Sequence, residues 1–252
     1  MPKPYMPKSH TYAILRGVAL VFVGLFLVSS CAAQEVEGTG KNGPAVFSDA
    51  TFLEVTAPLT NRVQANLYGF YLGNVGASVA LVEVPVKVQK YFTIIPAYLW
   101  VGIQPAGLSL VEGVPAASSY RENQFRLAGS FTIPVHHFIV SDRNLYVDRY
   151  TPAGQVNRYR NRIYVSHPIS FGRYKAHAFV YDEVFHDFVP GKWLRRNWAA
   201  AGVDLPLNRY VTLEPLFLRH DDALLRSVNF LALGVVVKTG KLFGHSKANA
   251  GP

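Results

Sequence analysis

Residues 157–188 read NRYRNRIYVSHPISFGRYKAHAFVYDEVFHDF, and charged side chains stand at every second position along much of this stretch. Arg158, Arg160 and Arg162 lie in its first half, and Glu183 lies in its second half. A period of two is that of a β-strand, because successive side chains of a strand point to opposite faces. The stretch therefore predicts a β-hairpin with one ionic face.

The same alternation appears in four predicted strands. These strands cover residues 119–132, 157–168, 174–187 and 209–219. In each, one face is apolar and the other carries Arg, Glu, Gln or Tyr. A soluble β-sandwich shows the same period with the opposite polarity, since its apolar face turns to the core. Arginines alternating with glutamates and large tyrosine rings are typical of a confined interior, which favours a membrane barrel.

The lengths of the predicted strands support this interpretation. Eleven candidate strands cover residues 48–57, 62–73, 77–88, 91–103, 119–132, 136–149, 157–168, 174–187, 194–205, 209–219 and 227–239. Most have about 10–14 residues, whereas soluble sheets favour about five or six and a tilted membrane strand needs about 9–11. The fold class predicted is all-β: a single-chain antiparallel transmembrane β-barrel of about 10–12 strands. Because bacterial barrels use even numbers, eleven candidates imply one error.

The connections differ in length on the two sides of the predicted barrel. GSFTIPVHH, HPISFGRYK and DLPLNRY predict tight turns, whereas DRYTPAGQVN, DFVPGKWLRR and LRHDDALLRS predict longer loops. Outer-membrane barrels combine short periplasmic turns with longer outer loops. Aromatic residues also gather near strand ends, at Tyr146, Tyr150, Trp193 and Trp198, where interfacial girdles occur.

The N-terminus predicts export. Residues 1–33 carry a basic start, an apolar run GVALVFVGLFLV and small residues, as a signal peptide does. Two cleavage sites remain open: a lipoprotein signal ending at Ser30 with Cys31 lipidated, or simple cleavage before Gln34. We expect a flexible lead-in over residues 34–46.

The remaining organisation follows from this interpretation. We expect the barrel to occupy residues 47–240, a flexible tail to occupy residues 241–252, and the protein to reside in the bacterial outer membrane. Cys31 is the single cysteine, so the mature chain has no disulfide. The formal charge of +9 falls to +6 without the three basic residues of the leader, and no Lys/Arg run occurs. Outer-membrane lipids and small solutes or ions are the expected partners, and nucleic acid is not.

The polar face predicts an ion-pair network inside the barrel. Its candidate members are Glu122, Arg126, Arg158, Arg160, Arg162, Lys175, Tyr181, Glu183 and Glu214. Two roles remain open. Paired charges could fix strand register and fill a small barrel, or a basic wall could line a narrow pore that favours anions. Both roles are those of a structural or small-solute channel protein.

Signals for catalysis are weak. The sequence has no G-x-S-x-G and no H-E-x-x-H motif. Ser166 and His167 should point to opposite faces of a regular strand. His220-Asp221-Asp222, in a predicted loop, could offer oxygen ligands to a cation, but adjacent side chains diverge. We therefore expect no enzymatic activity and no cofactor. An outer-membrane enzyme acting on envelope lipids and a soluble or lipid-anchored β-sandwich that binds a ligand are the alternatives.

One family resemblance agrees with the barrel. The succession NRYRNRIYVSHPI, FVYDEVFHDF, RRNWAAAGVDLPLNRYVTLEPLFLR and NFLALGVVV resembles a bacterial family known as domain of unknown function 2490, over about residues 119–239. The resemblance implies an outer-membrane β-barrel and no established reaction. One departure is the C-terminus: such barrels often end on an aromatic residue, whereas here GHSKANAGP follows Phe243.

Overall fold

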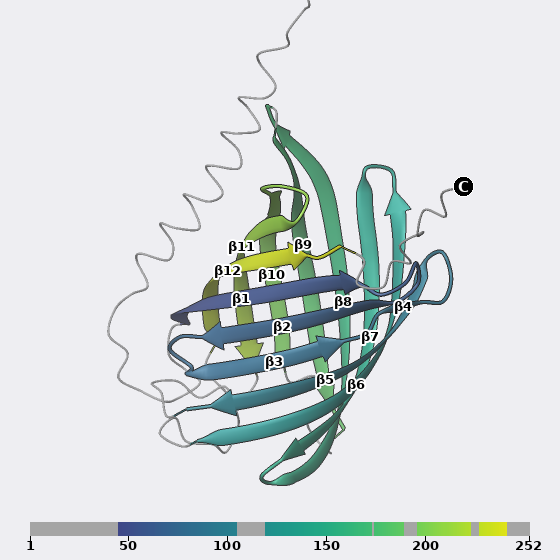
Figure 1. The fold of residues 1–252 in the computed structure, drawn as a ribbon. Coiled ribbons are helices and arrows are strands. Elements are labelled where there is room, and N and C mark those ends of the chain that lie inside the picture. Colours follow the sequence, from purple (N-terminus) through teal and green to yellow (C-terminus); the bar gives the residue numbers. More distant parts are fainter. Residues whose placement is uncertain (1–44, 105–118, 173, 189–195, 223–226, 241–252) are drawn as a thin grey trace, which may run out of the picture.

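The structure is a computed structural model that describes residues 45–104, 119–172, 174–188, 196–222 and 227–240. Every regular element in these residues is a β-strand (Figure 1). The strands are β1 (Val46–Pro58), β2 (Gln64–Leu72), β3 (Ala77–Glu83), β4 (Val86–Lys87), β5 (Phe92–Ile103), β6 (Tyr120–Val135), β7 (Phe138–Thr151), β8 (Gly154–Phe171), β9 (Tyr174–Asp187), β10 (Arg196–Pro206), β11 (Val211–Asp222) and β12 (Val228–Lys238). Within this part of the chain, no helix is long and apolar enough to cross a membrane. The expectations for the signal peptide, Cys31 and the C-terminal tail fall outside the described residues.

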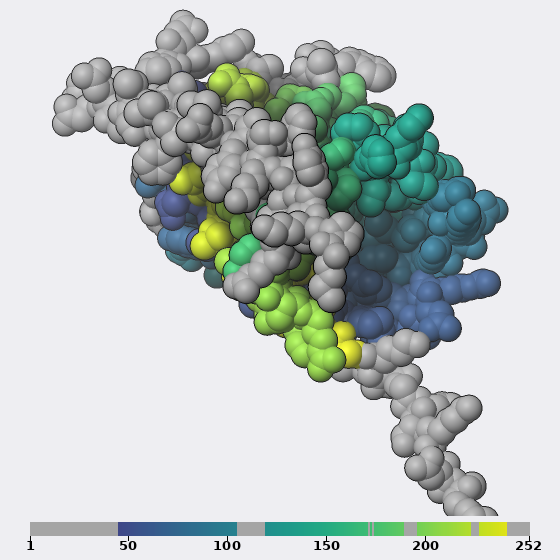
Figure 2. Space-filling model, turned by 90° about the horizontal axis from the view of Figure 1, so that it is seen from above, coloured from purple at the N-terminus to yellow at the C-terminus, as the bar shows by residue number. Residues whose placement is uncertain are grey.

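The sheet closes on itself into a barrel. Each strand pairs with its neighbours along the chain, β3 pairs with β5, and β1 pairs with β12. The two-residue β4 only flanks β5, so eleven strands complete the ring. In Figure 2, β12 in yellow lies beside β1 in purple, as this closure requires. The prediction of an all-β transmembrane-type barrel of about 10–12 strands is confirmed for the fold.

The expectation of an even strand number is wrong. β1 and β12 run parallel from Val46↔Val228 to Thr56↔Lys238, while the other neighbours are antiparallel. In an up-and-down ring with an odd number of strands, the first and last strands point the same way, so closure must be parallel. Parallel pairing is slightly weaker per residue, but eleven consecutive residue pairs connect these two strands.

The connections fall into two groups at opposite ends of the barrel. At one end, which we call the turn end, the hairpins β6–β7, β8–β9 and β10–β11 turn. The β8–β9 turn uses Gly172 at φ 62°, a conformation that glycine adopts without steric cost. At the other end, which we call the loop end, residues 104–119 and 188–195 connect strands. The longer loop expected in DRYTPAGQVN is instead a two-residue turn, because Thr151 pairs with Gly154.

Side chains alternate between the interior and the exterior. In β6, Tyr120, Glu122 and Gln124 are buried, whereas Phe125 and Leu127 are more than half exposed. Other strands also turn large apolar residues outward. Examples are Leu53, Leu67, Trp100, Ile163, Val180, Leu231 and Leu233. This polarity is the reverse of a soluble sandwich and is that of a barrel whose outside meets lipid.

One polar cluster interrupts the apolar exterior, on β7 and β8. The Asn161 amide donates to the Asp142 carboxylate at 2.6 Å, and the Tyr159 hydroxyl donates to Asn144. The Asn144 amide also donates to Asp142 at 3.1 Å. Because these side chains satisfy one another, the cost of placing them on an apolar face is reduced.

Candidate functional site

Arginines cover the inner face of strands β6 to β10. Every second residue of a strand points into the barrel, and each of these arginines occupies such a position. The residue-by-residue register of the strands fixes which positions point inward. They are Arg126 on β6, Arg143 and Arg149 on β7, Arg158, Arg160 and Arg162 on β8, and Arg196 on β10. We call this surface the arginine wall.

Glu183 on β9 is the centre of the arginine wall. Its carboxylate accepts from Arg160 Nε at 2.8 Å and from Arg162 at 2.7 Å, and its residue is 2% exposed. Arg162 lies directly opposite Glu183 in the β8–β9 register, and Arg160 reaches it from the neighbouring pleat. The Arg160 guanidinium also lies 4.2 Å from the centre of the Phe185 ring. One carboxylate thus holds two charged side chains in fixed positions.

Four further arginines are each paired with one carboxylate. These pairs are Arg143–Glu83 at 2.6 Å, Arg149–Glu122 at 2.6 Å, Arg196–Asp222 at 2.8 Å, and Arg158–Asp187. Three of the pairs connect adjacent strands. The Arg143–Glu83 pair differs, because β7 and β3 are separated by β5 and β6 in the ring, so this pair is a brace across part of the interior.

Arg126 completes the wall without a carboxylate partner among the described residues. Its Nε donates to the side-chain oxygen of Gln124 at 2.8 Å. The wall therefore has seven arginines against five carboxylates, an excess of two positive charges. The five carboxylates are Glu83, Glu122, Glu183, Asp187 and Asp222.

Most of the predicted network residues lie on this wall. Arg162 stacks over the Tyr181 ring at 4.6 Å, beside its bond to Glu183. Glu122 pairs with Arg149, which is not among the predicted members of the network. Lys175 lies apart: it is exposed, only one residue from the start of β9, and makes no ion pair within the described residues.

Glu214 also lacks an arginine partner, because it belongs to a different cluster. Its carboxyl group is within hydrogen-bonding reach of Asp204 on β10, and Glu54 on β1 lies near enough to interact with both charges. Asp204 is six residues along β10 from Trp198, which corresponds to about 20 Å. Glu54 and Glu214 nevertheless line the same cavity as the arginine wall.

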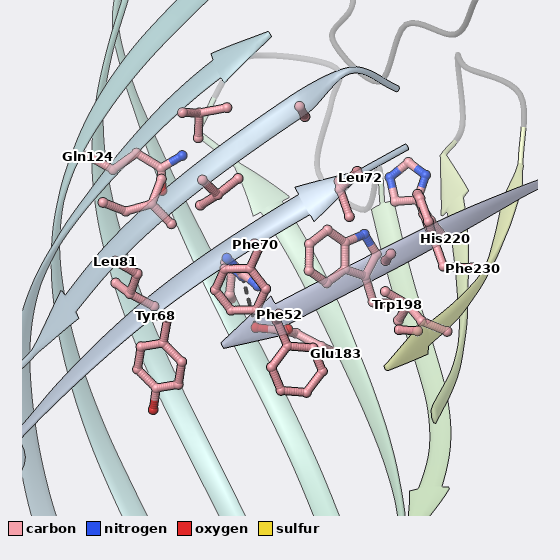
Figure 3. A pocket seen from close by; sticks show the side chains of 18 of the residues that line it. Phe52, Tyr68, Phe70, Leu72, Leu81, Gln124, Glu183, Trp198, His220 and Phe230 are labelled. Atoms are coloured by element: carbon pink, nitrogen blue, oxygen red, sulfur yellow. Dashed lines mark hydrogen bonds and ion pairs between the residues drawn. The ribbon is translucent and has the colours of Figure 1, made fainter. Parts of the chain in front are cut away.

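A cavity of about 440 Å³ separates the arginine wall from an opposite wall of apolar side chains. We call this second surface the aromatic wall. It comprises Phe52, Phe70, Leu72, Val79, Leu81, Leu99, Val101 and Phe230, from β1, β2, β3, β5 and β12. Phe52 and Phe70 lie with ring centres 5.7 Å apart. Figure 3 shows these two rings among the side chains that line the cavity.

Trp198 and His220 lie where the two walls meet, near the loop end. His220 is 1% exposed, and neither of its ring nitrogens has a hydrogen-bond partner among the described residues. In the same part of the chain, the indole Nε1 of Trp198 also lacks an acceptor. Both side chains line the cavity, with ring centres 5.9 Å apart (Figure 3). Buried polar groups without partners are rare in folded proteins, so this group needs an explanation.

The placement of His220 corrects the sequence interpretation of His220-Asp221-Asp222. These residues end strand β11 rather than forming a loop. His220 and Asp222 point inward, where Asp222 binds Arg196, while Asp221 points outward and binds Arg219 at 2.7 Å. The three side chains therefore do not converge on a cation, and no cluster of three or more His, Cys, Asp or Glu suited to a metal occurs in the described part of the chain.

Several interior residues escaped the sequence reasoning for a physical reason. Arg143 and Arg149 each follow an aspartate, in the dipeptides Asp142-Arg143 and Asp148-Arg149. Neighbouring side chains point to opposite faces, so one member of each dipeptide must be outside, and only the register decides which. The alternation along β7 could have identified the inner face, because Leu145 and Val147 point inward and Arg143 lies on the same face of the strand.

Ser166 and His167 do not form a catalytic pair. Ser166 is 6% exposed and faces the interior, whereas the His167 ring packs against Phe138 at 4.8 Å between ring centres. The two side chains lie on opposite faces of β8, as the strand period predicts.

The chain matches a family of known sequences over about two thirds of its length. The family described as "Protein of unknown function (DUF2490)" matches residues 54–222. No protein with a curated description matches significantly. The solved structure of the NanC porin aligns with a TM-score of 0.42 and 12% sequence identity, covering 67% of this chain and 79% of the porin. At that identity, the likeness says nothing about what this barrel binds or conducts.

Proposed function

The chain belongs to the DUF2490 family of proteins of unknown function. From this membership and its porin-like barrel, we propose that the protein is an outer-membrane channel for small solutes. We also propose that the channel favours anions. The observation that carries the proposal is the pairing of an apolar exterior with a charged interior that retains a cavity of about 440 Å³. A barrel filled only for stability has no need of such a space.

The exterior supports residence in a membrane. Large apolar side chains such as Leu127, Phe131 and Leu233 are about half exposed, which is costly in water. Closure of the sheet leaves no unpaired edge among the eleven ring strands, as a hydrocarbon environment requires. The longest connection, between β5 and β6, lies at the loop end, whereas the hairpins β6–β7, β8–β9 and β10–β11 turn tightly at the other end, an asymmetry also found in bacterial outer-membrane barrels.

The charge of the arginine wall supports a preference for anions. Five carboxylates neutralise most of the charge of its seven arginines, so two positive charges remain in excess on this wall. Glu54 and Glu214 line the same cavity from other strands. Fixed charges in a confined lumen act at short range and are screened less than surface charges. A ring or wall of arginines is the usual device by which pores select anions. Passage of solute needs no reacting group, and we propose a transport role rather than a catalytic one.

Conductance in planar bilayers tests this proposal. We expect reconstituted protein to give discrete current steps. A cysteine introduced at Tyr181, which lines the cavity, should allow a thiol-reactive cation to reduce the current in a background without Cys31. The same reagent should leave the current unchanged when the cysteine replaces Leu233, which is 49% exposed on the outside. Equal effects at both sites would show that current does not pass through the interior.

A closed structural barrel is the second candidate, and the Arg143–Glu83 brace favours it. This pair joins β7 to β3 at 2.6 Å across part of the interior, and such a brace narrows the path. If the brace closes the lumen, unsubstituted protein should show no steps, and Arg143→Ala together with Glu83→Ala should produce them. Absence of steps in both proteins would leave only the structural role.

A further inference from the structure

The geometry points to a binding site inside the barrel, formed by Trp198 and His220, for a small organic anion with a carboxylate-type group on an apolar or aromatic body. This inference rests on the proposed function for the route by which a solute reaches the cavity. Binding itself does not require conduction, so the two proposals can fail separately.

The first argument is the set of unused hydrogen-bonding groups. Trp198 Nε1 is a donor, and a neutral His220 ring has one donor and one acceptor. All three nitrogens are buried and have no partner within the described ranges of the chain, on side chains that line the cavity. A buried donor without an acceptor costs stability, whereas a ligand oxygen in the cavity would satisfy it. The two donors suit the oxygens of a carboxylate, and the acceptor suits a hydroxyl group on the same ligand.

The second argument is the charge around these two side chains. The Arg160 guanidinium lies 5.3 Å from the Trp198 ring centre, and Arg196 lies two residues before Trp198 on the same inward face. Arg126, which has no carboxylate partner among the described residues, lines the same cavity. The excess of two positive charges on the arginine wall favours an anion over a neutral or cationic ligand.

The third argument is the shape and chemistry of the remaining surface. The cavity has a size typical of small-molecule sites, which are mostly apolar with a few convergent polar groups. Phe52, Phe70 and Phe230 supply the apolar part, on the aromatic wall. Figure 3 shows Trp198, His220 and these three rings among the side chains that line the same cavity. A ligand with only a charge would leave this wall uncovered, and a purely apolar ligand would leave the three nitrogens unpaired.

Equilibrium dialysis with labelled benzoate tests the site in the full mature chain, held in detergent micelles with protein-free micelles as the blank. Benzoate has both features, acetate has only the charge, and benzyl alcohol has only the ring. We expect saturable binding of benzoate and binding at least tenfold weaker for each of the other two. Binding that does not saturate, or benzyl alcohol that binds as tightly as benzoate, would overturn the proposal without any substituted protein.

Substitutions locate the site. Trp198→Phe keeps a ring against Arg160 but removes Nε1, and His220→Phe removes both nitrogens at similar volume. We expect each to weaken benzoate binding about tenfold, the scale of one hydrogen bond to a charged group. Trp100→Phe is the matched control, because Trp100 is 37% exposed on the outer face, and it should change nothing. Unchanged affinity in both interior variants would show that benzoate binds elsewhere.

A spectroscopic readout keeps the proposal testable if an interior variant misfolds. The protein has three tryptophans, so its indole N–H signals in a ¹⁵N–¹H spectrum are few. We expect benzoate to move the Trp198 signal and to leave the Trp100 signal in place. Movement of the Trp100 signal alone would contradict the site.

Discussion

The arginine wall and the aromatic wall are inner faces of one sheet, yet they fill the barrel in different ways. On the arginine wall, long side chains bind carboxylates of neighbouring strands, as Arg160 and Arg162 bind Glu183. On the aromatic wall, rings such as Phe52 and Phe70 contact each other and border open space. The comparison teaches that ion pairing within one wall can hold charge in place without closing the interior.

The largest expected effect comes from breaking the arginine wall at its centre. Glu183→Gln retains the size of the side chain but leaves Arg160 and Arg162 without a carboxylate. Removing one partner of a buried ion pair typically costs about 3–5 kcal/mol, because a charge remains uncompensated. We expect a loss of that size in the free energy of unfolding, measured with urea on protein in lipid vesicles.

The matched control for this change is its neighbour on β9. Asp182→Asn alters a carboxylate on the outer face, where Asp182 accepts from Asn197 at 2.8 Å, and should change stability by less than about 1 kcal/mol. Equal losses for Glu183→Gln and Asp182→Asn would show that the buried wall has no special role.

A smaller loss of stability is expected where Phe52 of the aromatic wall packs against β12, the strand that pairs in parallel with β1. A Cβ at Gly234 on β12 would overlap the Phe52 ring. Gly234→Ala should therefore displace that ring and cost about 1–3 kcal/mol, as overpacking does. Gly69→Ala is the control, because a Cβ there meets nothing within 4 Å. Heat-modifiable gel mobility measures both, and a more severe defect at Gly69 would contradict the close packing at the β1–β12 closure.

The aromatic wall should tolerate the loss of a ring that faces open space. Phe70→Ala removes such a ring next to Phe52. In a packed core, this substitution costs about 3–5 kcal/mol, but here we expect less than about 2 kcal/mol and a larger single-channel current. A full core-sized loss of stability, with no increase in current, would mean that this wall is packed like a core.

The smallest effect is expected at an ion pair outside the barrel. The Arg219 and Asp221 side chains are 47% and 41% exposed, and their pair on the exterior is close to the loop end. Exposed pairs typically contribute about 0–1 kcal/mol. Arg219→Gln should therefore leave the urea midpoint nearly unchanged. A loss in the free energy of unfolding as large as that of Glu183→Gln would show that buried and exposed ion pairs contribute equally to stability.

The strand pattern of the barrel was predictable from the sequence, because alternation of period two identifies both the strands and their faces. All eleven predicted strands correspond to ring strands, including the early ones such as β1 and β2. The parallel closure was not predictable, since it depends on the parity of the strand count rather than on any residue pattern. Nor could the turn at Gly154 be separated from a longer loop by composition alone.

The sequence identifies the inward-facing residues of a strand only where one face of that strand is consistently charged and the other is not. β8 alternates without ambiguity, so Arg158, Arg160 and Arg162 could be placed inside. Partners depend on register, and therefore the pair of Glu122 with Arg149 could not be assigned from the sequence. The sequence pattern placed Trp198 in an interfacial girdle and His220 in a loop, whereas both side chains line the cavity. Their importance arises from the lack of hydrogen-bond partners among the described residues, which only three-dimensional structure reveals.

The reversal potential of the reconstituted channel in a potassium chloride gradient tests the central claim most directly. The account predicts discrete current steps that reverse toward the chloride equilibrium potential. It also predicts that Arg126→Gln, which removes a cation without a carboxylate partner in the described part of the chain, moves the reversal toward zero. Reversal toward the potassium equilibrium potential, or no current from well-folded barrels, would contradict an anion-favouring lumen.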